Sequence, residues 1–217
     1  MNNKHVFWQA LIFSLAIFVL GFIIGFFVER KTGENAEISI LNLELDLMDY
    51  EVTTKLLSDI SDCSLKEREL FKLADKIYIE AVELERYEYI TTLSSLLNAL
   101  HRRYDLLRVM LWLESVKIKK ECNSNFSTVV YVYEFSTKDI HRESKQRYFG
   151  NLLYDIKYKY GDRLILIPIA GNTNVDSLNL YLNYYNVTSF PSILINEKIV
   201  VDDVISFQEM ENIIFNK

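Results

Sequence analysis

The sequence predicts an α/β domain at the C-terminal end of the chain, preceded by an all-α segment and an N-terminal transmembrane helix. Three observations support this fold class. Residues 6–28 carry no formal charge, apolar residues recur at helical spacing as far as about Lys120, and strand-like and helix-like stretches alternate after Asn125. We therefore expect three parts along the chain: 1–31, 32–122 and 123–217.

The first part contains an uncharged run at residues 6–28, in which Gln9 and Ser14 are the most polar members. A helix needs about 20 apolar residues to cross the hydrocarbon core of a bilayer. A cleaved signal peptide is the alternative, but its apolar region is about 7–15 residues long and ends at a small-x-small site. This run is longer and leads directly into Glu29-Arg30-Lys31. We expect an uncleaved, single-pass anchor that contacts membrane lipid through residues 6–28.

Two further features of the anchor bear on its assembly and its orientation. Gly21 and Gly25 form a small-xxx-small pair, which lets helix backbones approach closely, so a homodimer through this pair is a hypothesis. Lys4 precedes the anchor, whereas Arg30 and Lys31 follow it. The positive-inside rule therefore gives almost a tie.

The second part predicts three helices. The first has an apolar stripe and ends near Asp62, the second begins at Ser64 with Glu67 completing a capping box, and the third continues to about Lys119. The apolar residues of the first stripe are Ile38, Leu41, Leu45, Met48, Val52 and Leu56. We expect a hairpin or small bundle, with an extended coiled-coil stalk as the alternative. On the third helix, Arg102, Arg103 and Arg108 with Asp105 and Glu114 predict a solvated face.

The third part shows alternating strand and helix patterns. Thr128–Phe135 is rich in β-branched and aromatic residues, and 163–169 is a nearly continuous apolar run, typical of a strand covered on both faces. The remaining expected elements are helices at 138–160, 176–185 and after a capping box at Ser206–Glu209, and a hairpin formed by 192–196 and 199–202. A right-handed crossover should make the first two strands parallel.

The β-α-β-α-β-β-α order, together with the segment Ser189-Phe190-Pro191-Ser192 before a hydrophobic strand, resembles the thioredoxin superfamily over roughly Ser127 to Asn216. The resemblance implies a cis peptide bond before Pro191 and an exposed edge at residue 190 that binds extended peptides. Active relatives place a Cys-x-x-Cys pair opposite this proline, but the matching region, 136–147, contains no cysteine. The anchor, the helical middle and the residues around Cys122 are also similar to uncharacterised archaeal membrane-anchored thioredoxin-like proteins.

The chain contains 2 cysteines, Cys63 and Cys122. If the second and third helices form an antiparallel hairpin, both cysteines lie at the same end of it. A disulfide then requires Cα atoms about 4.4–6.8 Å apart. Such a bond would imply an oxidising compartment and place the soluble part outside the cytoplasm. Two free, buried thiols are the alternative.

Other chemistries find little support in the sequence. The net charge of −6 argues against nucleic-acid binding. The three histidines, His5, His101 and His141, have no neighbours at metal-ligand spacing, so we expect no metal site. His141 lies where relatives place reactive groups, but a solvated helix start is the simpler interpretation. We also identify no catalytic constellation and expect no cofactor.

Three functions remain open. The first is a membrane-anchored, redox-inactive thioredoxin-like protein that binds a protein partner or assists assembly at the extracytoplasmic face, through Ser189, Phe190 and Pro191. The second is an atypical thiol-disulfide oxidoreductase that uses Cys63 or Cys122, which requires a thiol near Pro191. The third is a structural subunit of a membrane complex.

Overall fold

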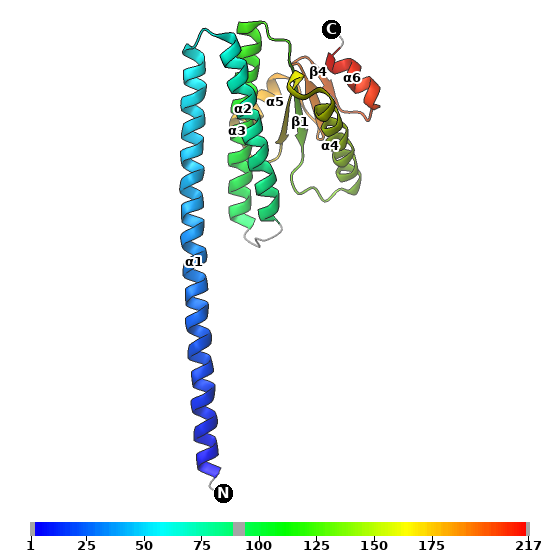
Figure 1. Cartoon of the computed structure of the whole chain (residues 1–217). Coiled ribbons are helices and arrows are strands. Elements are labelled where there is room, and N and C mark those ends of the chain that lie inside the picture. The colour runs from blue at the N-terminus through cyan, green and yellow to red at the C-terminus, as the bar shows by residue number, and fades with distance from the viewer. Residues whose placement is uncertain (1–2, 89–93, 216–217) are drawn as a thin grey trace. The chain divides into compact units, whose positions relative to one another are not determined.

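The structure, a computed structural model, describes residues 3–88 and 94–215 and divides into two compact units, Met1–Thr53 and Thr54–Lys217. One continuous helix, α1 (Asn3–Asp59), contains both the apolar N-terminal run and the stretch that follows it (Figure 1). No proline interrupts the chain before residue 168, so nothing breaks this helix sharply. Its segment Phe7–Phe26 is long and apolar enough to span a membrane, with a mean hydropathy of 2.4.

Helices α2 (Cys63–Glu88) and α3 (Ser94–Cys122) pack against each other as a hairpin. The expected capping box at Ser64 and Glu67 is wrong. Instead, Asp62 caps α2, because its Oδ1 accepts hydrogen bonds from the backbone N–H groups of Ser64 and Leu65.

A single mixed sheet forms the centre of the second unit. Its strands are β1 (Ser127–Tyr133), β2 (Leu164–Ala170), β3 (Ser192–Ile195) and β4 (Ile199–Val201), in the spatial order β2-β1-β3-β4. Strands β1 and β2 are parallel, as the crossover rule predicts, with Ser127 opposite Leu164. Strand β3 is antiparallel to both β1 and β4.

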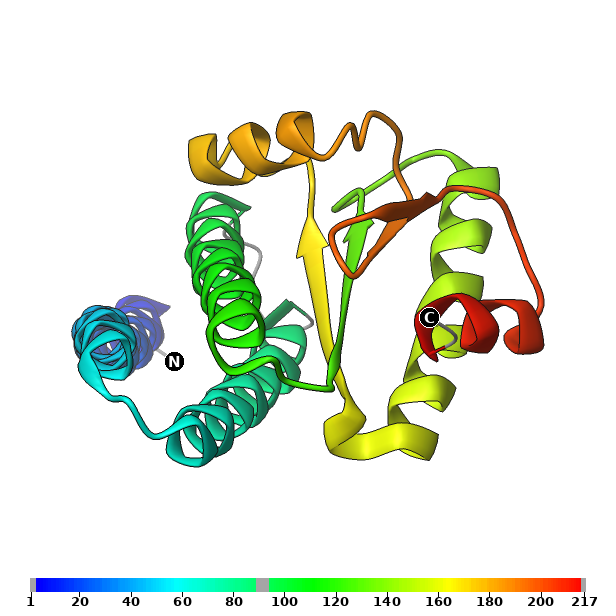
Figure 2. The same cartoon turned by 90° about the horizontal axis from the view of Figure 1, so that it is seen from above.

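Helices cover both faces of this sheet. Figure 2 shows α3 and α5 (Asp176–Tyr184) on one face, and α4 (Ile140–Tyr160) and α6 (Phe207–Phe215) on the other. A 3-10 turn, η1 (Gly161–Arg163), connects α4 to β2. The capping box at the start of α6 is confirmed, since the Ser206 N–H donates to the Glu209 carboxylate and the Glu209 N–H donates to the Ser206 hydroxyl.

The α2–α3 hairpin belongs to the same compact unit as the sheet, although the sequence places a boundary at residue 123. The reason lies in β2, where successive side chains point to opposite faces of the sheet. Leu164 joins the core under α4, whereas Ile165 and Ile167 alternate with it and are buried on the other face. Helix α3 packs against β2 and supplies the apolar cover that this second face requires.

Candidate functional site

The three residues predicted to bind a peptide lie at the end of the sheet where β1 and β2 finish. Pro191 is buried and Ser189 is exposed, and the Phe190–Pro191 peptide bond is cis. The next residue, Ser192, pairs with Val132 near the C-terminal end of β1. The loop is therefore held at a fixed position beside the ends of two parallel strands.

The ring of Phe190 lies against the backbone of Gly171, the first residue after β2. A β-carbon added to Gly171 would lie 2.7 Å from Cε1 and 2.8 Å from Cε2 of this ring. The Gly171 N–H donates to the Tyr133 carbonyl at 2.8 Å, which fixes the glycine beside the end of β1. A side chain at this position would therefore displace the phenyl ring of Phe190.

The backbone of Phe190 is a free edge. Within residues 3–88 and 94–215, its N–H and carbonyl groups have no protein hydrogen-bond partner. The neighbouring Ser189 carbonyl accepts a hydrogen bond from the Ser192 hydroxyl. Backbone polar groups need partners, and at this exposed loop only water or an added chain can supply them.

The loops that follow β1 and β2 are tied together by one amide side chain. The Phe135 N–H donates to Asn172 Oδ1 at 2.8 Å, and Asn172 Nδ2 donates to the Phe135 carbonyl at 2.9 Å. The amide of Asn172 thus bonds to both backbone groups of Phe135, as a residue of a paired strand would. It holds Phe135 beside the loop that contains Gly171.

Helix α3 supports the same loop from beneath through a buried carboxylate. Asp105 is 1% exposed and accepts hydrogen bonds from the Ala170 N–H at 3.1 Å and the Thr173 hydroxyl at 2.7 Å. Burial raises the pKa of Asp105, while the Thr173 hydrogen bond and the nearby Arg108 guanidinium, 3.7 Å away, act in the opposite direction. The helical segment therefore positions the end of β2 as well as covering the sheet.

The solvated face predicted for α3 is wrong for three of its members, since Asp105, Arg108 and Glu114 are all buried. His101, one turn before Asp105, is also buried, and its ring lies on the Phe135 ring with centroids 3.8 Å apart. His101, Asp105, Arg108 and Trp112 recur at helical spacing. This periodicity was available in the sequence and could have revealed a buried polar face.

The start of α4, where His141 lies, is held by an N-cap. His141 is exposed, and its N–H donates to the carboxylate of Asp139, the N-cap residue. Hydrogen bonds from the Arg142 and His141 N–H groups lower the pKa of Asp139. This arrangement is that of an ordinary capped helix, and no cluster with metal-binding potential is found among the described residues.

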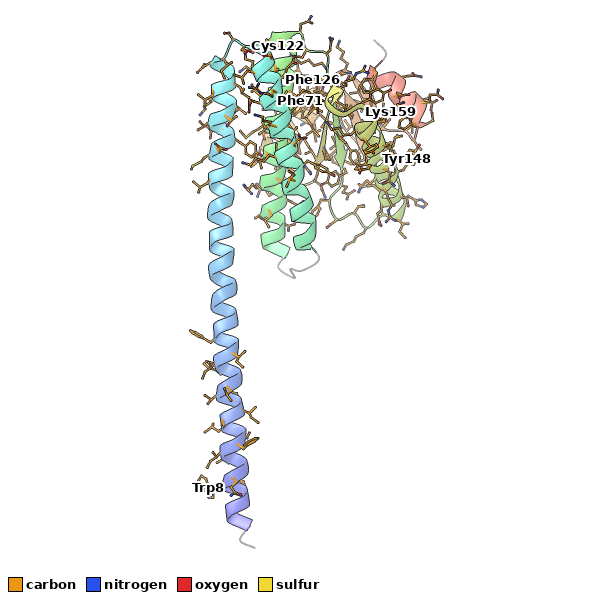
Figure 3. All side chains as sticks on the ribbon, viewed as in Figure 1. Trp8, Phe71, Cys122, Phe126, Tyr148 and Lys159 are labelled. Carbon is orange, nitrogen blue, oxygen red and sulfur yellow. A yellow bond between two sulfur atoms is a disulfide. The ribbon has the colours of Figure 1, made fainter. Side chains whose placement is uncertain are left out.

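Cys63 and Cys122 are joined in a disulfide, with Cα atoms 5.6 Å apart, which confirms the predicted pairing. The bond links the first residue of α2 to the last residue of α3, at the end of the hairpin where Figure 3 labels Cys122. Strand β1 begins at Ser127, close to this end, whereas the partner of Ser192 is Val132. Five residues of extended strand, about 17 Å, separate these two points, so the sulfur atoms lie far from Pro191.

A second polar assembly, absent from the sequence predictions, fixes the opposite end of β3. Glu197 Oε1 accepts hydrogen bonds from the Trp112 indole N–H at 3.2 Å and the Thr128 hydroxyl at 2.6 Å. Lys119 Nζ donates to Asn196 Oδ1 at 2.6 Å. Asn196 and Glu197 both have positive φ, at 50° and 58°, as the tight turn of this hairpin requires.

The comparisons with known proteins give one weak likeness. No family model and no curated protein matches the chain. Among solved structures, oxidized thioredoxin O2 from Arabidopsis thaliana is similar over 47% of this chain and 83% of its own, with 11% identity and a TM-score of 0.31. The geometry of the site therefore rests on the contacts within this chain.

Proposed function

We propose that this protein is a membrane-anchored thioredoxin-like protein that binds an extended segment of a partner protein at the Ser189–Pro191 loop, without dithiol chemistry. The observation that carries the proposal is the unpartnered backbone of Phe190 at an exposed loop. An added chain can pair with free backbone groups in the manner of a β-strand, and this recognition needs no sulfur.

The surroundings of the loop support binding. Phe190 is half-buried against Gly171. Phe135 is also half-buried, and it contacts Asn172 and His101. These contacts hold the edge in place in the absence of a partner. A preorganised edge loses little conformational entropy when it binds. The polar backbone and the adjacent aromatic rings together suit an extended segment with apolar side chains.

The anchor and the disulfide supply the rest of the proposal. The apolar helix Phe7–Phe26 holds the protein at a membrane as a single span. The Cys63–Cys122 disulfide is favoured in an oxidising compartment, which supports an extracytoplasmic location for the folded unit. The distance of both sulfur atoms from Pro191 favours binding over the oxidoreductase alternative.

A site-specific photocross-linking experiment tests the binding edge. The full chain in detergent carries p-benzoylphenylalanine at Ser189 or, as a control, at Lys198, an exposed residue at the other end of β3. The probe is reduced, carboxymethylated α-lactalbumin, an unfolded chain without free thiols. We expect cross-linking at Ser189 that exceeds the Lys198 yield at least several-fold and falls when Gly171→Ala displaces the Phe190 ring. Equal yields at the two positions, or no effect of Gly171→Ala, would refute the proposed edge.

A further inference from the structure

Two Asn-x-Ser/Thr tripeptides lie in the second unit, outside the contacts of the candidate site. They are Asn125-Phe126-Ser127 and Asn186-Val187-Thr188. This tripeptide is the acceptor of N-linked glycosylation, which needs the side-chain amide of the asparagine and the hydroxyl of the third residue. Because so short a motif also occurs by chance, the three-dimensional setting of each tripeptide must distinguish them.

The second tripeptide begins where α5 ends, and its backbone is held by the end of that helix. The Asn186 N–H donates to the Asn183 carbonyl at 3.2 Å. The Val187 N–H donates to the Leu182 carbonyl at 2.9 Å. With a φ of 56° at Asn186, these two bonds form a Schellman motif. The main chain is therefore fixed by bonds that do not involve the Asn186 side chain.

Both reactive members of this tripeptide are open to solvent. Asn186 and Thr188 are exposed, whereas Val187, between them, is buried. Within the described ranges 3–88 and 94–215, the side-chain amide of Asn186 and the hydroxyl of Thr188 have no hydrogen-bond partner. A glycosyltransferase can therefore reach both groups without breaking a contact of the fold.

The first tripeptide differs in its hydroxyl. Asn125 is exposed, but Phe126 is buried and its ring lies edge-on to the Phe71 ring, with centroids 5.6 Å apart. Ser127 is the first residue of β1, and its buried hydroxyl donates to the Ile214 carbonyl at 3.0 Å. The fold therefore already uses the hydroxyl that this motif needs, and Asn125 provides an internal comparison.

We infer that Asn186 is a site of N-linked glycosylation and that its glycan narrows access to the Ser189–Pro191 loop. The donor is a sugar carried on a membrane lipid phosphate. The amide nitrogen of Asn186 forms a bond to the anomeric carbon of this sugar, and the bond from that carbon to the phosphate oxygen breaks. The lipid phosphate leaves with the bonding electron pair, and the nitrogen gives one proton to a base of the transferase. No oxidation or reduction is involved.

Glycosylation of Asn186 requires the extracytoplasmic location in the proposed function, on which it therefore rests. The Cys63–Cys122 disulfide supports the same location, because disulfides persist in oxidising compartments. Among the described residues, Phe7–Phe26 is the one candidate membrane span, and it precedes both cysteines and Asn186. The disulfide and Asn186 therefore share one side of the membrane.

A glycan on Asn186 lies beside the candidate binding edge. Asn186 precedes Ser189 by three residues, which span at most about 11 Å even when the chain is fully extended. N-linked glycans are bulky and hydrated, so one attached here occupies the solvent next to the loop. An extended partner that pairs with the Phe190 backbone must share this space, and glycosylation should therefore weaken its binding.

Peptide mass spectrometry of the full chain, purified from its native membranes with a C-terminal epitope tag, tests the modification. After reduction, trypsin separates the two tripeptides into peptides 121–138 and 164–198. We expect peptide 164–198 to carry sugar in more than half of the molecules. Thr188→Ala, at an exposed position, should reduce this fraction at least ten-fold, whereas Thr188→Ser keeps the hydroxyl and should retain at least half of it. Asn125→Gln should leave it unchanged.

Antibody binding to the tag on intact cells reports the side of the membrane independently of any sugar. An external tag with unmodified Asn186 would overturn the inference and leave the location and the binding edge intact. Sugar on Asn125 alone would overturn it in the same way. A cytoplasmic tag would refute the location in the proposed function and the glycosylation with it.

Photocross-linking to reduced, carboxymethylated α-lactalbumin measures access to the loop. With p-benzoylphenylalanine at Ser189, Thr188→Ala should increase the yield at least two-fold relative to the glycosylated chain. The same two proteins made in a host without N-glycosylation should give equal yields, which controls for the substitution itself. Equal yields from the native membranes as well would refute the narrowed access. Absence of cross-linking from the unglycosylated chain would refute the proposed binding edge, and the narrowed access with it.

Discussion

The ring of Phe190 occupies the space that a side chain at Gly171 would need. These residues stand 19 positions apart, one after β2 and the other before β3. Their contact holds the loop that carries Pro191 against the end of β2. Among the described residues, no hydrogen bond joins this loop to β2 itself. The free backbone of Phe190 is therefore positioned by packing of its own side chain.

A double-mutant cycle tests this contact. Gly171→Ala should lower the free energy of unfolding by about 1–3 kcal/mol, because the added methyl group overpacks the site. In a Phe190→Leu background the same change should cost much less, because the ring that it displaces is absent. Urea denaturation of the four proteins measures the coupling. Additive effects would show that the ring and the glycine do not interact.

The buried carboxylate of Asp105 should make stability depend on pH. Burial raises its folded-state pKa above the value of about 3.9 expected in the unfolded chain. At pH values between these two pKa values, the folded chain binds more protons than the unfolded chain. The contribution of Asp105 to stability is therefore largest below pH 4 and decreases as pH rises through the folded-state pKa.

Asp105→Asn tests this dependence. The amide retains an acceptor for the Ala170 N–H and offers a donor to Thr173, but it cannot ionise. We expect the stability of the variant relative to wild type to increase from about pH 4 upwards, measured by urea denaturation across the pH range. A constant difference between the proteins would contradict the raised pKa.

The disulfide should be a substantial source of stability. Replacing both Cys63 and Cys122 with serine removes a covalent link between residues 59 positions apart. The expected loss is about 2–5 kcal/mol, chiefly because the unfolded chain regains conformational freedom. Denaturation with and without reductant measures it. Reductant should destabilise the wild type by a similar amount and leave the double variant unchanged. Comparable sensitivity of both proteins to reductant would exclude this role.

Glu197 should stabilise the packing of α3 on the β3–β4 turn. Glu197→Ala leaves the indole N–H of Trp112, a fully buried residue, without its acceptor, and we expect a loss of about 1–3 kcal/mol. Glu197→Gln retains an acceptor oxygen and should lose less. Thermal denaturation of both variants compares them. An equal loss would indicate that the negative charge, and not the hydrogen bond, stabilises the turn.

Local patterns in the sequence were sufficient for much of the fold. The uncharged run of α1, the strand-like stretch that became β1 and the capping box before α6 depend on neighbouring residues, whose spacing is visible directly. The cysteine pairing also followed, because two helices of similar length joined by a short connection bring their outer ends together.

Predictions failed where a residue's environment is set by distant parts of the chain. Charged residues are usually exposed to solvent, so the sequence predicts exposure for Asp105, Arg108 and Glu114. In the folded chain, however, α3 places all three in the interior. Asp105 is tolerated there because the end of β2, more than 60 residues later, supplies hydrogen-bond donors. No local pattern contains that information.

The amino-acid sequence by itself determined the apolar N-terminal run, the order of the elements and the absence of cysteine from residues 136–147, because each depends only on residue type and near-neighbour spacing. The tertiary structure decided that α3 belongs with the sheet, that Gly171 and Asn172 shape the Ser189–Pro191 loop, and that the disulfide lies at the far end of β1. These relationships arise from packing and hydrogen bonds between segments that only folding brings together.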